Sequence, residues 1–249
     1  MAGRLAGKVA LVTGAGQGIG QGTALALARE SAAVGLAGRR AAALEKVAAQ
    51  IQELGGKALV VTCDVAERAQ VDRAVAVVGE HFGGLDILVN NAQSSTQQPV
   101  EAITDADIEL SWRSGTLGTL YAMQAALPLL RARGGGCVVN FGSSTGMDGD
   151  PMFGAYAMAK EAIRGLSRVA AREWGRYGIR VNVVVPIALS PAAEQYARDH
   201  PERFAAVAEG LPLGRMGDPE QDIGRAIVSL VSDDLAYLTG QTLRLTGGG

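Results

Sequence analysis

The stretch Thr13-Gly14-Ala15-Gly16-Gln17-Gly18-Ile19-Gly20 follows the short apolar run 9–12 and precedes an alanine-rich segment of helical periodicity. Glycines at these positions permit a tight turn and let a ligand approach the backbone closely. The amino terminus of the following helix offers free N–H groups and the positive end of its dipole to a pyrophosphate. Strand, turn and helix in this order predict a dinucleotide-binding βαβ unit whose turn contacts the cofactor through Gly14, Ala15, Gly16, Gln17, Gly18, Ile19 and Gly20.

Beyond this unit, short β-branched runs alternate with longer helix-period segments. Strands are expected at 9–12, 33–37, 58–62, 87–89, 137–141, 180–185 and 242–245. Helices are expected near 19–31, 41–54, 67–81, 105–131, 155–176 and 219–231. The alternation predicts an α/β fold: a Rossmann-like, doubly wound parallel sheet of about seven strands with helices on both faces.

We find no linker or low-complexity tract, so residues 1–249 are expected to form a single dinucleotide-binding domain. The segment 187–216 differs from the rest, because prolines interrupt short amphipathic pieces within it. A segment of this kind at the carboxyl edge of a sheet favours a substrate lid.

Composition excludes several classes of function. The chain has 249 residues, and 48% of them are hydrophobic. It has 25 acidic and 23 basic residues, with no basic run suited to binding a phosphate backbone, so nucleic acid is not an expected partner.

No apolar stretch reaches eighteen residues and no signal peptide is readable, so we expect no membrane span and a cytoplasmic location. Cys63 and Cys137 are expected to be buried thiols in a reducing compartment. With only His81 and His200, and no clustered ligands, no metal is expected.

Candidate chemistry lies at Ser143, Tyr156 and Lys160. Positions four apart on a helix share a face, so the Lys160 ammonium is expected beside the Tyr156 phenol, where it would lower the phenol pKa from about 10. A phenol with a lowered pKa can serve as a general acid or base. The Ser143 hydroxyl is expected to polarise a carbonyl oxygen.

The residues at the end of the second expected strand indicate whether the chain prefers NAD(H) or NADP(H). A site selective for NAD(H) places a carboxylate there for the ribose 2′-hydroxyl, whereas this chain has Gly38-Arg39-Arg40. Glycine leaves room for a 2′-phosphate, and Arg39, with Arg40 in support, can form charge-assisted contacts with it. The sequence therefore predicts NADP(H) in preference to NAD(H). The alternative is that both arginines are solvated residues at the start of a helix.

These residues together resemble the short-chain dehydrogenase/reductase family over essentially the whole chain, in particular its 3-oxoacyl-acyl carrier protein reductases and other ketoreductases. The matching motifs are Thr13 to Gly20, Cys63-Asp64-Val65, Asn90-Asn91-Ala92, Ser143, Tyr156 and Lys160. The resemblance implies that Asp64 and Val65 border the adenine and that the region of Asn91 and Ala92 packs against the cofactor. It also implies that Tyr156 and Lys160 lie against the cofactor, with Lys160 on the nicotinamide ribose, and that the backbone of Leu189 contacts the nicotinamide amide.

The implied activity is hydride transfer between the nicotinamide and a carbonyl or alcohol substrate, with Tyr156 as the acid or base. Met147, Met152, Phe153, Leu189, Tyr196 and Phe204 are expected near the pocket mouth and favour an apolar or aromatic ketone, although such residues also occur as simple packing. The segments 105–131 and 155–176 resemble the surfaces by which relatives form tetramers, which implies a homotetramer or homodimer.

Several positions depart from the family pattern. Gly115 stands where the family has an asparagine that holds a water leading protons to the lysine, and Gln93 stands where it usually has glycine. Ile187 stands where the family commonly has glycine. The family's threonine hydroxyl is missing at the expected place, and two alternatives stay open: Ser190 supplies a hydroxyl in its stead, or no residue does. These departures suggest an alternative, a nucleotide-binding regulator or scaffold with weak or no turnover. A lyase-like relative that uses no nicotinamide is a third reading, but it conflicts with the intact glycine turn.

Overall fold

Seven parallel strands form one sheet in the computed structural model, which describes residues 3–249 apart from the side chains of Pro191, Ala192, Tyr196 and Arg203. The strand order is β3-β2-β1-β4-β5-β6-β7, and every neighbouring pair is parallel. The strands are β1 (Val9–Thr13), β2 (Ala33–Gly38), β3 (Lys57–Thr62), β4 (Ile87–Asn90), β5 (Gly136–Phe141), β6 (Ile179–Pro186) and β7 (Thr242–Leu245). The predicted sheet is confirmed, with strand ends within about two residues of those expected.

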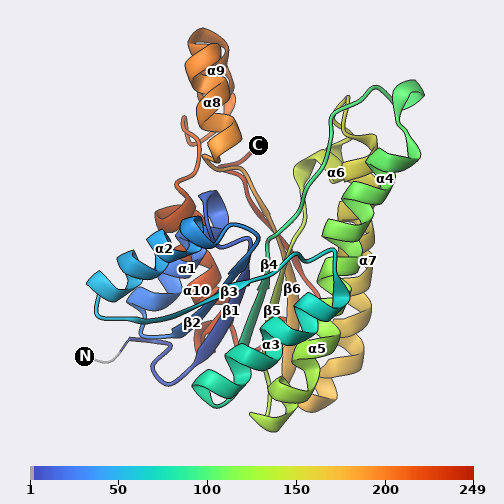
Figure 1. The fold of residues 1–249 in the computed structure, drawn as a ribbon. Helices are drawn as coiled ribbons and strands as arrows, with labels where there is room; N and C mark the ends of the chain where they lie inside the picture. Colours follow the sequence, from blue (N-terminus) through green and yellow to red (C-terminus); the bar gives the residue numbers. More distant parts are fainter. Residues whose placement is uncertain (1–2) are drawn as a thin grey trace.

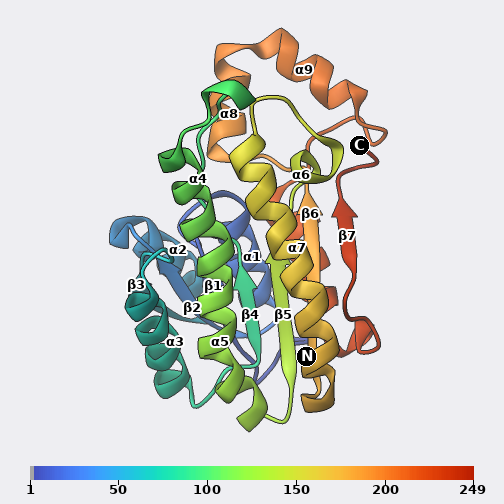
Figure 2. The ribbon, with the colours of Figure 1, turned by 90° about the vertical axis from the view of Figure 1, so that its right-hand side faces the viewer.

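Helices cover both faces of the sheet (Figures 1 and 2). One apolar cluster packs the sheet against α1 (Gly18–Arg29), α2 (Ala41–Glu53) and α10 (Arg225–Val231). A second cluster packs the other face against α3 (Arg68–Phe82), α5 (Gly118–Ala132) and α7 (Gly154–Trp174). Strands buried on both sides read as continuous apolar runs, which explains why their positions were predictable.

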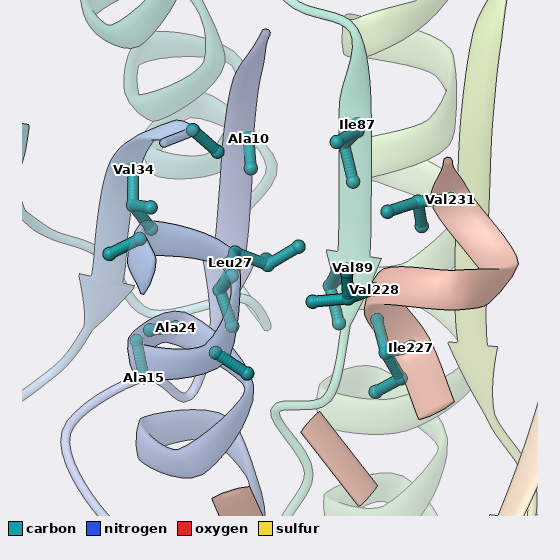
Figure 3. Close-up of a cluster of buried hydrophobic side chains, with 14 of the residues drawn as sticks. Ala10, Ala15, Ala24, Leu27, Val34, Ile87, Val89, Ile227, Val228 and Val231 are labelled. Atoms are coloured by element: carbon teal, nitrogen blue, oxygen red, sulfur yellow. The ribbon is translucent and has the colours of Figure 1, made fainter. Parts of the chain in front are cut away.

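The first cluster fixes α1 against the sheet. Figure 3 shows side chains of α1 and α10 gathered against β1, β2 and β4, with Leu27 and Val228 among them, all of them buried. The small side chains of Ala15 and Ala24 are fully buried in the same cluster. Because alanine lets a helix approach closely, α1 is held with its amino terminus at the carboxyl end of β1.

The strand order creates a crevice beside that helix end. From β1 the chain builds β2 and β3 on one side of the sheet and then β4 to β7 on the other, so the order reverses between β1 and β4. Connections leaving the two strands diverge at such a switch point, which is where open α/β sheets bind ligands. The strand order therefore places a ligand crevice between the ends of β1 and β4.

The predicted helix 105–131 consists of three segments: α4 (Asp105–Ser111), the π-helical η2 (Trp112–Leu117) and α5. The single helix predicted over 105–131 is thus interrupted, and Gly115 and Gly118, two residues that stabilise a helix poorly, lie at the interruption. The predicted last helix is likewise a π-helical turn, η4 (Pro219–Gly224), followed by α10.

Segment 187–216 contains two helices, α8 (Pro191–Asp199) and α9 (Pro201–Gly210), which stand above the carboxyl ends of the strands (Figure 1). Each begins at a proline that had suggested interruption, because proline suits the first turn of a helix. The short α6 (Ser144–Asp148) and the single-turn segments η1 (Val100–Ala102), η3 (Gly175–Tyr177) and η5 (Asp233–Leu235) were not predicted.

Both cysteines are buried free thiols, as expected, and burial raises the pKa of each to about 11. In the part of the chain that the structure describes, none of the helices combines the length and the apolar character needed to cross a bilayer.

A buried carboxylate ties the amino ends of β1 and β4 together. Asp86 accepts hydrogen bonds from the Val9 N–H at 2.9 Å and from Arg133 Nε and Nη2 at 3.1 Å each. We expect Asp86→Ala to lower the free energy of unfolding by about 2–3 kcal/mol, since it leaves the buried Val9 N–H without a partner and leaves the Arg133 guanidinium with only its bond to the Gly7 carbonyl. Urea unfolding measures this. Asp72→Ala, which removes an exposed pair with Arg68, should cost under about 1 kcal/mol; equal losses would contradict the assignment.

Candidate active site

The glycine turn after β1 is held from β4. Asn91 Nδ2 donates to the carbonyl oxygens of Thr13 at 3.0 Å and Gly14 at 3.2 Å. Thr13 Oγ1 accepts from the N–H groups of Asn91 and Ala92. Gly14 has a φ of 67°, and a Cβ at Gly20 would lie 2.2 Å from the Gly14 carbonyl oxygen, so side chains are excluded at both positions. Thr13 and Asn91 therefore fix the turn, a role that the sequence did not reveal for Thr13.

The turn opens onto α1 with donors free for an anion. The helix begins at Gly18, and its N-cap, Gln17, makes no side-chain cap bond. The first N–H groups of a helix have no partner within the helix and carry the positive end of its dipole. The turn therefore offers the donors that a pyrophosphate requires.

A cleft of about 600 Å³ lies along this turn and the ends of β1, β2 and β4. It is lined by most of the predicted cofactor residues: Gly14, Gly16, Gln17, Gly18, Ile19, Arg39, Arg40, Asp64, Val65, Asn91 and Ala92. Ala15 and Gly20 do not line it and support the turn from below, and Leu189 borders a neighbouring pocket. The lining also contains residues that were not predicted to bind cofactor, among them Gly38, Ala43, Ala66, Gln93, Ser94 and Ser190.

The two arginines that follow β2, Arg39 and Arg40, differ in their hydrogen-bond partners. Arg40 Nη2 donates to Gln17 Oε1 across the cleft mouth, so Gln17 holds this arginine rather than adding charge. Arg39 lines the cleft, is exposed, and has no hydrogen-bond or ion-pair partner among the described residues. The atoms nearest to a Cβ built at Gly38 all belong to the Leu44 side chain, the nearest at 3.4 Å, which is ordinary van der Waals contact and leaves space beside the strand end. Arg39 is therefore the free cation at this end of the cleft in the described part of the chain.

Ser143, Tyr156 and Lys160 gather at the carboxyl end of β5. Ser143 is the N-cap of α6, where its Oγ accepts from the Thr145 N–H at 3.2 Å. Tyr156 and Lys160 lie one turn apart on α7, with the Lys160 ammonium 5.5 Å from the centre of the Tyr156 ring. Lys160 is buried and donates to the Phe141 carbonyl at 2.8 Å. None of the three lines the cleft described above, but they lie at the same edge of the sheet, since the carboxyl ends of parallel strands meet at one edge.

The electrostatics of this group differ from the expectation. Burial raises the pKa of Tyr156 above its usual value, and a hydrogen bond with Ser143 acts in the opposite direction. The Lys160 ammonium lies 5.5 Å from the centre of the Tyr156 ring and donates to the Phe141 carbonyl, and the net shift of the phenol pKa is upward, so the predicted lowering of this pKa is not found in this arrangement. Burial also lowers the pKa of Lys160 itself, to about 7. The site therefore combines a protonated phenol with a lysine whose pKa is close to 7.

Two departures from the family pattern meet in space. A Cβ built on Gly115 would lie 2.7 Å from Cδ of Gln93, so the Gln93 amide occupies the space that a side chain at 115 would take. The other departures lie in the segment 187–216. Ile187 donates its N–H to the Leu245 carbonyl at 3.0 Å, and its carbonyl accepts from the Gly217 N–H at 3.2 Å. Ser190 Oγ accepts from the Ala193 N–H at 3.1 Å, so this hydroxyl caps α8 while its residue also lines the cleft.

Leu189 donates its N–H to the Gly217 carbonyl at 2.9 Å. Near the active group, the Phe153 ring packs 6.0 Å from the Tyr156 ring, and Met152 is exposed with a φ of 74°. The side chain of Tyr196, expected at the pocket mouth, lies outside the described residues. Within the residues that the structure describes, no group of three or more His, Cys, Asp or Glu could hold a metal ion.

A doubly wound sheet with a glycine-lined cleft at its switch point defines the class of dinucleotide-binding α/β proteins. Within that class, residues 14–249 match the family model described as enoyl-(acyl carrier protein) reductase, and the chain belongs to the short-chain dehydrogenase/reductase family. It is an oxidoreductase that acts on alcohol or carbonyl groups, and a nicotinamide dinucleotide is the cofactor typical of the family.

Relatives cover nearly the whole chain. A 12α-hydroxysteroid dehydrogenase from a Clostridium species is 42% identical, over 97% of this chain and 96% of its own. A galactitol 2-dehydrogenase from Agrobacterium fabrum is 36% identical, over 98% of both chains. The crystal structure of a 7α-hydroxysteroid dehydrogenase complexed with NADH and 7-oxo glycochenodeoxycholic acid superposes with a TM-score of 0.93 at 32% identity, covering 99% of this chain and 95% of that one.

Proposed function

We propose that this protein is an NADP(H)-dependent carbonyl reductase or alcohol dehydrogenase in which Tyr156 exchanges the proton with the substrate oxygen. The observation that carries the proposal is that Ser143, Tyr156 and Lys160 lie together at the carboxyl end of β5, at the same edge of the parallel sheet as the glycine-lined cleft. Acid–base groups beside a dinucleotide cleft are what a reductase of this class requires.

The residues present fit a dinucleotide. A Cβ on Gly16 would lie 3.1 Å from Ala43 Cβ, so the turn is a cradle that side chains would fill. The glycine turn and the first turn of α1 would hold the pyrophosphate, and Asp64 and Val65 would contact the adenine. Asn91 and Ala92 would form the floor of the cleft beneath the cofactor. Lys160 and the Leu189 carbonyl would hold the nicotinamide end. A bound nicotinamide would supply or accept the hydride.

Side chains of the protein would supply the proton that the reaction needs. A pKa raised by burial keeps the Tyr156 phenol protonated at neutral pH, which suits donation to the oxygen of a ketone undergoing reduction. Ser143 would orient that oxygen through its hydroxyl, a contribution aimed at developing negative charge. Lys160, with a pKa near 7, would replace the proton that Tyr156 gives up.

For the substrate we propose an apolar or aromatic ketone or alcohol, of the size of a steroid. The exposed Met152, the Phe153 ring beside Tyr156, and the hydroxysteroid dehydrogenase at 42% identity support this class. The galactitol 2-dehydrogenase shows that polyols are also handled by relatives. We further propose one domain over residues 1–249, with α8 and α9 as its lid.

We also propose a homotetramer or homodimer formed through the helices 105–131 and 155–176. The exposed side chains of Leu110, Trp112, Met158 and Val169 on these helices support such an assembly. Two buried free thiols support a reducing, cytoplasmic location.

The proposed function is tested by titrating the protein with NADPH and NADH and measuring turnover of a panel of steroid, aromatic and aliphatic ketones. We expect tighter binding of NADPH and measurable reduction of the apolar ketones. Tight NADPH binding without turnover on any ketone would favour the nucleotide-binding regulator instead, and equal use of both cofactors would remove the assignment of Arg39.

Arg39→Ala is expected to lower the ratio of kcat/KM with NADPH to that with NADH by about 10- to 100-fold. The reason is that a charge-assisted contact with the 2′-phosphate is worth about 1.5–3 kcal/mol, and Arg39 is the guanidinium available for it. Arg40→Ala is the matched control, with a smaller expected effect because Arg40 already binds Gln17. The preference should also weaken with added salt, since Arg39 is exposed. An unchanged ratio in Arg39→Ala, with a large change in Arg40→Ala, would reverse the assignment.

A further inference from the structure

The cofactor cleft has a wall whose residues were not predicted to bind a nucleotide. It is formed by α4 and η2, which contribute Ala106, Glu109, Leu110, Arg113 and Ser114 to the lining. Arg113 is the cation on this wall, and 45% of its side chain is exposed. The turn after β3 lines the same cleft through Asp64, Val65 and Ala66. The wall therefore brings an arginine to the cleft besides the two that follow β2.

Arg113 connects this wall to the turn after β3. Its Nη2 donates to the Ala66 carbonyl at 3.3 Å and to Glu67 Oε1 at 3.0 Å. Its Nη1 lies 3.5 Å from Glu109 Oε1. Single exposed ion pairs contribute little to stability, but three acceptors around one guanidinium restrict how it can turn. The guanidinium is therefore held across one end of the cleft.

The charges at this end do not suit a phosphate. Glu67 and Glu109 neutralise Arg113, and the Asp64 side chain belongs to the same lining. Arg39, in contrast, has no hydrogen-bond or ion-pair partner among the described residues and is available for an anion. A phosphate near Arg113 would meet carboxylates, so this end suits an uncharged part of a nucleotide.

An arginine whose terminal N–H groups are already bonded offers a ligand its flat face more readily than its edge. Guanidinium faces stack on aromatic rings, and Arg68 does so on Tyr121 in this protein, at 5.1 Å from the ring centre. The apolar side chains of Leu110 and Val65 line the cleft with Arg113 and also suit a ring. The end of the cleft at Arg113 is therefore built for a flat, uncharged aromatic group.

We propose that the adenine of the dinucleotide stacks on the guanidinium of Arg113, which Glu67 and Glu109 hold in place. Of the two rings in a nicotinamide dinucleotide, the nicotinamide belongs beside Tyr156, so the ring left for Arg113 is the adenine. The inference rests on the proposed function, because it concerns a dinucleotide bound in this cleft. It assigns Arg113 to the part that NADPH and NADH share and leaves Arg39 to the 2′-phosphate alone.

The test titrates wild type and Arg113→Met with NADPH, NADH and AMP, using fluorescence for the first two and calorimetry for AMP. Methionine keeps an unbranched apolar stem and removes the flat group. We expect the dissociation constants of all three ligands to rise by the same factor, about 3- to 10-fold, since each contains adenine. At saturating NADPH, kcat should stay within about twofold of wild type, because a base contact remote from the reacting atoms acts on binding. In Arg39→Ala only the constant for NADPH should rise.

Arg113→Lys separates stacking from charge. Lysine keeps the positive charge without the flat fork, so we expect the same weakening as in Arg113→Met. Wild-type affinity in Arg113→Lys would mean that Arg113 acts as a charge, and it would overturn the proposal. Glu67→Gln, which removes one of the carboxylates that position the guanidinium, should raise all three constants by about twofold.

Arg68→Met is the matched control. Arg68 is exposed to a similar extent, at 52%, and is also paired, with Asp72 and Gln124, but it does not line the cleft. Its replacement should leave all three dissociation constants within about twofold of wild type. Thermal midpoints of Arg113→Met and Arg68→Met without nucleotide show whether each variant is folded. Equal constants for AMP in folded Arg113→Met and wild type would overturn the proposal.

The AMP titration needs no ketone, so it separates this inference from the proposed function. Binding of AMP that depends on Arg113, in a protein that reduces no ketone, would uphold the inference while the proposed function fails. Ketone reduction with constants unchanged in Arg113→Met would have the opposite meaning. A crystal structure of the complex with AMP should show the adenine plane against the Arg113 guanidinium, and an adenine seated elsewhere would contradict the assignment.

Discussion

Replacing Tyr156 with phenylalanine is expected to lower kcat for ketone reduction about a thousandfold and to leave the dissociation constant for NADPH nearly unchanged. The substitution removes the hydroxyl and keeps the ring, which packs beside Phe153. General acid catalysis by a positioned side chain is worth about 10²- to 10⁴-fold, and the raised pKa of Tyr156 makes its proton available at neutral pH. Steady-state kinetics with NADPH and an apolar ketone, together with fluorescence titration of NADPH, measure both quantities.

The matched control is Tyr177→Phe. Tyr177 stacks on the guanidinium groups of Arg131 and Arg176 at the far end of α7, so loss of its hydroxyl should leave turnover within about twofold of wild type. Retention of full activity by Tyr156→Phe would show that another group supplies the proton, and Ser143 would be the next candidate.

Replacing Lys160 with methionine is expected to move activity and stability in opposite directions. The loss of the ammonium should lower kcat about 10²- to 10³-fold, since the phenol then has no buried neighbour from which to recover its proton. The free energy of unfolding should rise, because the substitution replaces a buried ammonium with an apolar side chain of similar length.

The pH dependence of this stability difference follows from the lowered pKa. Between about pH 7 and 10.5 the unfolded chain binds a proton at Lys160 that the folded chain does not, so wild-type stability gains from Lys160 as pH rises through this window. The excess stability of Lys160→Met should therefore be largest below pH 7, on the order of a few kcal/mol, and should shrink toward pH 10. Urea unfolding across this range checks it. A constant difference would show that Lys160 keeps its usual pKa in the folded protein.

Much of the fold could be predicted because the sheet is buried on both faces. The run Val9–Val12 is apolar throughout, and Cys137–Phe141 is apolar apart from the buried Asn140, which is typical of a parallel strand covered on both faces. The interruption at η2 was foreseeable only as two glycines in a helical pattern, since a π-helical turn depends on packing against α7 that the sequence does not display. The helices α8 and α9 were less visible, because prolines at their first turns look like breaks from the sequence alone.

The cofactor turn was predictable for a similar reason: glycines, strand and helix lie next to one another in the chain. The partnership of Gln93 with Gly115 was not predictable. The two residues are separated by more than twenty positions, and each reads in isolation as a missing family residue. The effect of Lys160 on Tyr156 was misjudged because helical spacing places two side chains on one face without fixing where the ammonium points. Here the Phe141 carbonyl decides that direction.

The bonds from Asn91 to Thr13 and Gly14 have a consequence for binding kinetics. With the floor of the cleft already fastened to β4, the backbone has little conformational freedom left to lose when a dinucleotide arrives. Association should then be limited by diffusional encounter and not by rearrangement of the turn.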